Sequence, residues 1–161
     1  MEIERKFWVR PTIDLDDIPS GKQIQNIYLH MDAKTETRLR KKGENWILTT
    51  KTGHGLVRGE EEVAVDEQTA KNLMAIGRKA ESLYIIPKTR YNFGRWEIDE
   101  FPDRLVTAEI ELESKEERLP EFPEGFRVVR EVTGIPFFSN AVMAIHGTPI
   151  QYFEFTYASD G

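Results

Sequence analysis

Charged residues occupy every second position along most of the predicted strands of this chain. In the first strand, which we expect to end near residues 9–10, strict alternation places Glu2, Glu4 and Lys6 on one face. Further strands are predicted at 23–31, 35–42, 46–52, 57–65, 83–93, 95–101 and 104–114. In most of them apolar residues alternate with the charged ones, least regularly in the 46–52 strand. The sequence therefore predicts an antiparallel sheet with one charged and one apolar face.

Two helices are predicted beside these strands. Asp66 can cap a helix over residues 66–79, in which Ala70 and Leu73 begin an apolar stripe at helical spacing. A shorter helix is predicted to begin at residue 139 or 140 and to end at 146, before a glycine and a proline. The fold class expected from both patterns is α+β with antiparallel strands predominant.

A length of 161 residues favours one domain over 1–161. Residues 1–114 would form most of the sheet, and residues 115–161 a C-terminal helical and extended segment that begins with a proline-containing connector. The aromatic alternation of residues 152–157 could form an edge strand or a contact between two copies of the chain, so a homodimer is one expected assembly.

The overall composition excludes several classes of protein. With 28 acidic and 22 basic residues the net charge is −6, which argues against binding of nucleic acid or of an anionic membrane. The absence of cysteine excludes disulfides, thiolate metal sites and a thiol nucleophile. No apolar targeting segment and no membrane-spanning run are recognisable, so a cytoplasmic location is expected.

The alternating charges are grouped by sign. The cations are Lys6, Arg38, Arg40, Lys51, Arg58, Lys88 and Arg90, and the carboxylates are Glu2, Glu4, Glu60, Glu62, Glu97, Asp99, Glu109, Glu111 and Glu113. In any one strand such residues are typical of a solvated face with weak ion pairs. Together they favour a sheet closed into a barrel with the charges inside, which is stable only if the interior holds water, metal ions or a charged ligand.

The two groups of charges suit two kinds of ligand. Arginine and lysine bind phosphate oxygens, and clustered carboxylates bind hard cations such as Mg²⁺ or Mn²⁺. Local alternatives are weaker: the three histidines have no metal-ligand spacing, and the glycines around residue 54 lack the frame of a phosphate-binding loop. We expect Trp8, Trp46 and Trp96 to lie in the core or on the barrel exterior under helices.

The ordered set of motifs resembles the CYTH superfamily, the triphosphate tunnel metalloenzymes. The motifs that carry the resemblance are Glu2-x-Glu4-x-Lys6 at the N-terminus, Arg38-x-Arg40, Lys51, Arg58-x-Glu60-x-Glu62, Lys88-x-Arg90, Glu97-x-Asp99 and Glu109-x-Glu111. The resemblance implies a closed, tunnel-like barrel of about eight antiparallel strands with a few flanking helices. Members of the superfamily include inorganic tripolyphosphatases, thiamine triphosphatases, class IV adenylate cyclases and RNA triphosphatases.

The resemblance also implies roles for individual residues. Glu2, Glu4, Glu109 and Glu111 would bind the metal, and Lys6, Arg38, Arg40, Lys51, Lys88 and Arg90 would bind the phosphates. Arg58 would either bind phosphate or pair with a neighbouring glutamate. Glu60, Glu62, Glu97 and Asp99 would complete the metal site or orient the cations, while Glu113 continues the charged face beyond the family motif. Lys6, Glu4 and Glu111 are the candidates for proton transfer, and the sequence does not choose among them.

The function expected from these residues is Mg²⁺- or Mn²⁺-dependent hydrolysis of a short linear polyphosphate, with inorganic tripolyphosphate as the first candidate. The alternatives are a class IV-type adenylate cyclase, a thiamine triphosphatase, and a non-catalytic module that binds polyphosphate or nucleotide. A salt-bridged β-domain without a ligand is the remaining alternative.

Overall fold

A nine-stranded antiparallel sheet organises the computed structural model, which describes residues 3–32, 34–53 and 59–150. The strands are β1 (Ile3–Pro11), β2 (Lys22–Met31), β3 (Thr35–Lys42), β4 (Asn45–Thr52), β5 (Gly59–Val65), β6 (Tyr84–Phe93), β7 (Trp96–Glu100), β8 (Val106–Leu112) and β9 (Phe126–Glu131). Their order in the sheet is β5-β4-β3-β2-β6-β7-β8-β1-β9. The first eight strands lie close to the predicted positions, and β9 was not predicted.

Both predicted helices are confirmed as α1 (Glu67–Lys79) and α2 (Asn140–His146). The Asp66 carboxylate accepts a 2.7 Å hydrogen bond from the Thr69 N–H, and the Ser139 hydroxyl accepts one of 3.2 Å from the Val142 N–H, so each helix has a side-chain N-cap. Three short 3₁₀ helices also form: η1 (Leu15–Asp17), η2 (Pro102–Arg104) and η3 (Pro136–Phe138). None of the described helices is long and apolar enough to span a membrane.

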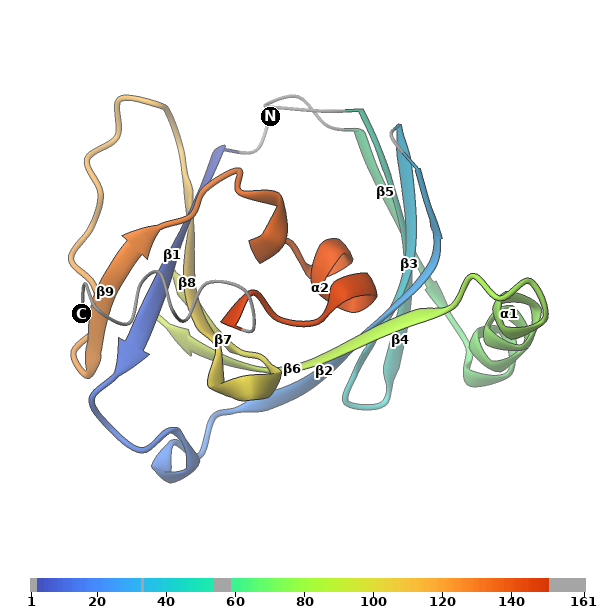
Figure 1. The fold of residues 1–161 in the computed structure, drawn as a ribbon, viewed down its shortest axis with the longest axis horizontal. Helices are drawn as coiled ribbons and strands as arrows, with labels where there is room; N and C mark the ends of the chain where they lie inside the picture. Colours follow the sequence, from blue (N-terminus) through green and yellow to red (C-terminus); the bar gives the residue numbers. More distant parts are fainter. Residues whose placement is uncertain (1–2, 33, 54–58, 151–161) are drawn as a thin grey trace.

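The prediction of a closed barrel of about eight strands is wrong for the described residues. The ladder ends at β5 on one side and at β9 on the other, and these two strands do not pair with each other. The sheet curves strongly, and α2 lies inside the curve (Figure 1). Phe138 and Met143 of this inner segment pack against Trp8 and Tyr28 of the sheet. The inner segment thereby covers apolar residues of the concave face. This face is therefore buried in part although the edge strands β5 and β9 do not pair.

The convex face carries two further apolar clusters. One, which includes Trp96 and Ile98, packs against the connector between β8 and β9, where Phe122 stacks on Trp96 with ring centroids 4.6 Å apart. The other includes Trp46 and is covered by α1. The expected positions of Trp46 and Trp96 are therefore confirmed, and so is that of Trp8, which lies in the core on the concave side with Phe138. The predicted strand or contact at 152–157 lies outside the described residues.

Candidate functional site

Strand register places the predicted charged residues of the described strands on the concave face of the sheet. Residues directly opposite each other on antiparallel strands point to the same side. Arg90 lies opposite Asp99, Glu97 lies opposite Glu109, and Glu109 lies opposite Lys6. The same face therefore continues through β6, β7, β8 and β1. On the other side of β6, the paired residues of β2, β3, β4 and β5 continue the same face.

A buried ion-pair network occupies the centre of this face, on β6 and β7. The Asp99 carboxylate accepts hydrogen bonds from Lys88 Nζ at 2.8 Å and from Arg90 Nε and Nη2 at 2.8 and 2.9 Å. The Glu97 carboxylate lies 2.6 Å from Arg90 Nη1, and the Glu97 side chain is 40% exposed. Asp99 thus holds both cations in fixed positions, as a residue that orients them would.

The pKa values of this network reflect burial and close charges. Burial raises the pKa of Asp99, but Lys88 and Arg90 outweigh it and hold that pKa at about 2. Burial lowers the pKa of Lys88 to about 8 despite the Asp99 charge. Burial also lowers the pKa of Arg90, but its bonds to Asp99 raise it more, so the net shift is upward. The Asp99 carboxylate and the Arg90 guanidinium are therefore charged at neutral pH.

Carboxylates gather on β8 and β1, next to the network. Glu4 lies opposite Glu111 and Lys6 lies opposite Glu109. Burial raises the pKa of Glu109, but a side-chain hydrogen bond with Glu4 and the charge of Lys6 more than compensate, so the pKa of Glu109 lies below its usual value. The Glu4 and Glu109 side chains are therefore in direct contact. Glu2, the first residue of the predicted metal set, lies outside the described residues.

The Lys6 ammonium is tied to the segment inside the curve. Lys6 Nζ donates a 3.1 Å hydrogen bond to the main-chain carbonyl of Phe138, at the end of η3. The Lys6 N–H donates to Thr133 Oγ1 at 2.9 Å. Both contacts join residues more than 120 positions apart, so no local sequence pattern could have predicted them.

Arginines dominate the part of the concave face on β3. Arg40 Nε donates a 2.8 Å hydrogen bond to Asn26 Oδ1, and Asn26 Nδ2 donates one of 3.4 Å to Asn140 Oδ1 of α2. Burial, with the charges of Arg38 and Arg90, lowers the pKa of Arg40 to about 10. Burial raises the pKa of Tyr28, which hydrogen-bonds with Arg38, to about 12. Sequence reasoning missed Asn26, although Asn26 alternates with Tyr28 on the polar side of its strand.

The face ends at β4 and β5, where it is more open to solvent. Lys51 lies opposite Glu60, and Thr49 lies opposite Glu62. Both glutamates are exposed and Lys51 is half-buried. Arg58, the neighbouring candidate for phosphate binding, lies outside the described residues.

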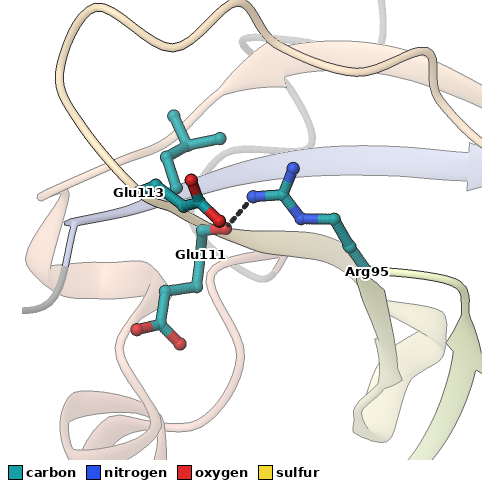
Figure 2. Close-up of a pocket in the computed structure, with 4 residues that line it drawn as sticks. Arg95, Glu111 and Glu113 are labelled. Carbon is teal, nitrogen blue, oxygen red and sulfur yellow. Dashed lines mark hydrogen bonds between the residues drawn. The ribbon is translucent and has the colours of Figure 1, made fainter.

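A separate pocket of about 490 Å³ lies at the end of β8 and is lined by Arg95, Glu111, Leu112 and Glu113. Arg95 donates hydrogen bonds to Glu117 at 2.7 Å and to the main-chain carbonyl of Glu111 at 2.8 Å. Figure 2 shows the Glu111 carboxylate pointing away from Arg95. Glu113 follows β8 and its N–H donates to Glu117, so this glutamate does not continue the concave face as a strand residue.

Within the described residues, no group of three or more His, Asp or Glu side chains is arranged to hold a metal ion. The contact between Glu4 and Glu109 brings together two of the predicted ligands. Oxygen donors of this kind match the preference of Mg²⁺ and Mn²⁺, which commonly bind one or two protein carboxylates together with water and substrate phosphate. The residues present therefore fit a hard divalent cation that shares its coordination with substrate.

Comparison with protein-family models and with curated proteins finds no match. Among solved structures, the inorganic triphosphatase NE1496 is similar in two determinations, with TM-scores of 0.57 and 0.56 at 23% identity. Each match covers 90% of this chain, with 98% and 95% of the other chain covered. A "putative adenylate cyclase" from Bacillus halodurans is similar with a TM-score of 0.51 at 15% identity, over 77% of this chain and 95% of the other. The chain has the CYTH fold that these proteins share, as its motifs indicated.

Proposed function

We propose that this chain is a metal-dependent phosphohydrolase of the CYTH superfamily that cleaves a short linear polyphosphate, with inorganic tripolyphosphate as the preferred substrate. One observation carries the proposal. On a single concave face, buried arginines and lysines on β3 and β6 adjoin carboxylates on β7, β8 and β1. A metal–polyphosphate complex presents the complementary charges to such a face.

The cations divide into two groups in this proposal. The first group donates directly to phosphate oxygens, since arginine offers a planar fork of donors and lysine a compact charge. Its members are Arg38, Arg40, Arg58, Lys51 and Lys6. Lys88 and Arg90 already donate to Asp99 and chiefly neutralise the charge of the substrate from beneath it. Asp99 and Glu97 orient these two cations, and Glu60 and Glu62 line the open end near β5.

The carboxylates of β1 and β8 would hold the metal. Glu4 and Glu109 are in contact, Glu111 lies opposite Glu4, and Glu2 precedes them on the same alternation. A bound Mg²⁺ or Mn²⁺ would neutralise the charge on the phosphate oxygens and lower the pKa of a water molecule. The surrounding residues position the terminal phosphate and stabilise the charge that develops in the transition state.

The reaction is the attack of water on the terminal phosphorus. A new P–O bond forms to the water oxygen, the bridging P–O bond breaks, and the products are orthophosphate and pyrophosphate. The water proton passes to the carboxylate of Glu4 or Glu111, and Lys6, as an ammonium, is the candidate that donates a proton or hydrogen bond to the departing pyrophosphate oxygen. Lys6 is held by the Phe138 carbonyl at 3.1 Å, so its ammonium is already fixed on this face.

Parallel assays with tripolyphosphate, thiamine triphosphate and ATP, each with Mg²⁺, Mn²⁺ or chelator, test the proposal. Metal-dependent release of orthophosphate, fastest from tripolyphosphate, is expected. Faster turnover of thiamine triphosphate would instead identify a thiamine triphosphatase, and cyclic AMP formed from ATP an adenylate cyclase. The cyclase is the second candidate because the fold is also that of the Bacillus halodurans protein. Binding of tripolyphosphate without turnover would indicate a binding module. A homodimer, one 1–161 domain and a cytoplasmic location remain predictions.

A further inference from the structure

Two of the three buried polar groups that have no hydrogen-bond partner within the described residues lie on the arginine-rich part of the concave face. They are Arg38 Nε and Thr49 Oγ1. Arg38 is 6% exposed and Thr49 is 1% exposed. Buried donors without partners are rare in folded proteins because each of them loses its bonds to water. The two groups therefore call for an explanation by a ligand.

Register brings these two residues together. Arg38 on β3 lies directly opposite Thr49 on β4, so both side chains belong to the concave face. On its other side Arg38 lies opposite Tyr28 and hydrogen-bonds with it, which leaves Nε as the donor without a partner. Arg40 on the same strand adds a second positive charge. The only carboxylates opposite Thr49 and Lys51 along β5 are the exposed Glu62 and Glu60 within the described part of that strand.

We propose that Arg38 and Thr49 form a paired anion site, in which the guanidinium N–H and the threonine hydroxyl donate to oxygens of one phosphate group of the substrate. Thr49 is then a substrate-binding residue that the charge pattern did not identify. The inference rests on the proposed function and deepens it. The strands beside the pair are the more exposed part of the face, since Lys51 is half-buried and most of β5 is exposed.

Thr107 offers a matched control. Its hydroxyl is also buried without a partner in the described structure, and the residue is 1% exposed. Thr107 lies opposite Asp99 on one side and Trp8 on the other, so it belongs to the acidic part of the face and not to the arginine part. The same substitution at the two positions therefore separates anion binding from the removal of a buried hydroxyl.

The experiment measures calorimetric binding of tripolyphosphate and of pyrophosphate in chelator, so that no turnover is required, together with thermal unfolding of the free protein. Thr49→Val should raise the dissociation constant about tenfold, without lowering the unfolding midpoint. Thr49→Ser, which keeps the hydroxyl, should stay within about threefold of wild type, and Thr107→Val should leave the dissociation constant unchanged. An unchanged dissociation constant for Thr49→Val, or an equal increase for Thr107→Val, would overturn the inference.

The outcomes also separate this inference from the proposed function. Wild-type binding that weakens in Thr49→Val, without hydrolysis in a parallel Mg²⁺ assay, would overturn the hydrolase and retain the anion site. Hydrolysis by wild type with normal binding by Thr49→Val would retain the hydrolase and overturn the site. If wild type binds neither anion in chelator, the anion site is overturned, and if it also fails to hydrolyse tripolyphosphate with Mg²⁺, both proposals are overturned.

Discussion

The Lys88 ammonium donates a 2.8 Å hydrogen bond to the Asp99 carboxylate, and the two side chains are only 1% and 2% exposed. Arg90 donates to the same carboxylate through two nitrogens. One buried aspartate thus balances two buried cations at the boundary between the arginine-rich and carboxylate-rich parts of the face. Because Asp99 supplies this counter-charge, the protein can stay folded with Lys88 and Arg90 charged when no ligand is bound.

Replacing Asp99 should destabilise the fold strongly. Asp99→Asn keeps the shape of the side chain but leaves the buried Lys88 without a counter-charge and Arg90 with only the partly exposed Glu97, so a loss of about 3–5 kcal/mol in the free energy of unfolding is expected. Glu97→Gln is the control, because Glu97 is 40% exposed and should cost at most about 1 kcal/mol. Denaturant unfolding measures both values. Equal losses for the two variants would contradict a structural role centred on Asp99.

The same network predicts a response to acid. The pKa of Asp99 in the folded chain is about 2, below its ordinary value of 3.8, so the unfolded chain binds the proton more readily. The stability that Asp99 contributes is therefore present above about pH 4 and is lost as the pH falls toward 2. Carbon NMR of the Asp99 carboxyl should show it ionised at pH 3. A titration midpoint near 4 in the folded protein would refute the prediction.

Glu111 and Glu113 should differ sharply in their effect on catalysis. Glu111 lies on β8 opposite Glu4, whereas Glu113 follows the strand and its N–H is bound by Glu117. Glu111→Gln should lower kcat by about a hundredfold or more, with the unfolding midpoint preserved, because a proposed metal ligand is lost. Glu4→Gln should do the same. Glu113→Gln should leave kcat unchanged, and a comparable loss there would remove the distinction between concave face and rim.

Arg40 should act chiefly on substrate binding. Arg40→Ala removes a guanidinium from the concave face and should raise KM about tenfold or more, with a smaller effect on kcat. Lys41, its neighbour on β3, belongs to the other face and lies over the Trp46 ring at 5.4 Å. Lys41→Ala therefore removes the same charge from the same strand and should leave KM unaffected. Steady-state kinetics with tripolyphosphate compares the two variants. An equal increase in KM for both would indicate a general effect of the lost charge, and an unchanged KM for Arg40→Ala would contradict its role in binding.

Strand positions and the charged face could be predicted from local alternation. The charge at every second residue in Glu36, Arg38 and Arg40 gives both the strand and the side of the sheet. The edge strand β9 was missed because Val128 and Val129 are adjacent, with Arg127 and Arg130 flanking them, so no period of two is visible. This strand is specified by pairing with β1, where its register shifts between Trp8 and Val9.

The open sheet and the inner segment could not be predicted in the same way. Whether β5 and β9 meet depends on the curvature of the whole sheet and on what fills its concave side, and neither is a local property. Trp8 lies in the core, as expected, but its packing against Phe138 inside the curve joins residues 130 positions apart and has no local signal. The Phe138 group that accepts a hydrogen bond from Lys6 is a main-chain carbonyl, which every residue has, so the residue type at position 138 does not predict this contact.

Hydrolysis of tripolyphosphate by the purified chain, measured as orthophosphate release with Mg²⁺, with Mn²⁺ and with chelator, tests the central claim most directly. The account predicts metal-dependent turnover that chelator abolishes and that Glu111→Gln eliminates while Glu113→Gln retains it. Absence of orthophosphate release under every metal condition, from a folded protein that binds tripolyphosphate, would contradict the assignment as a hydrolase.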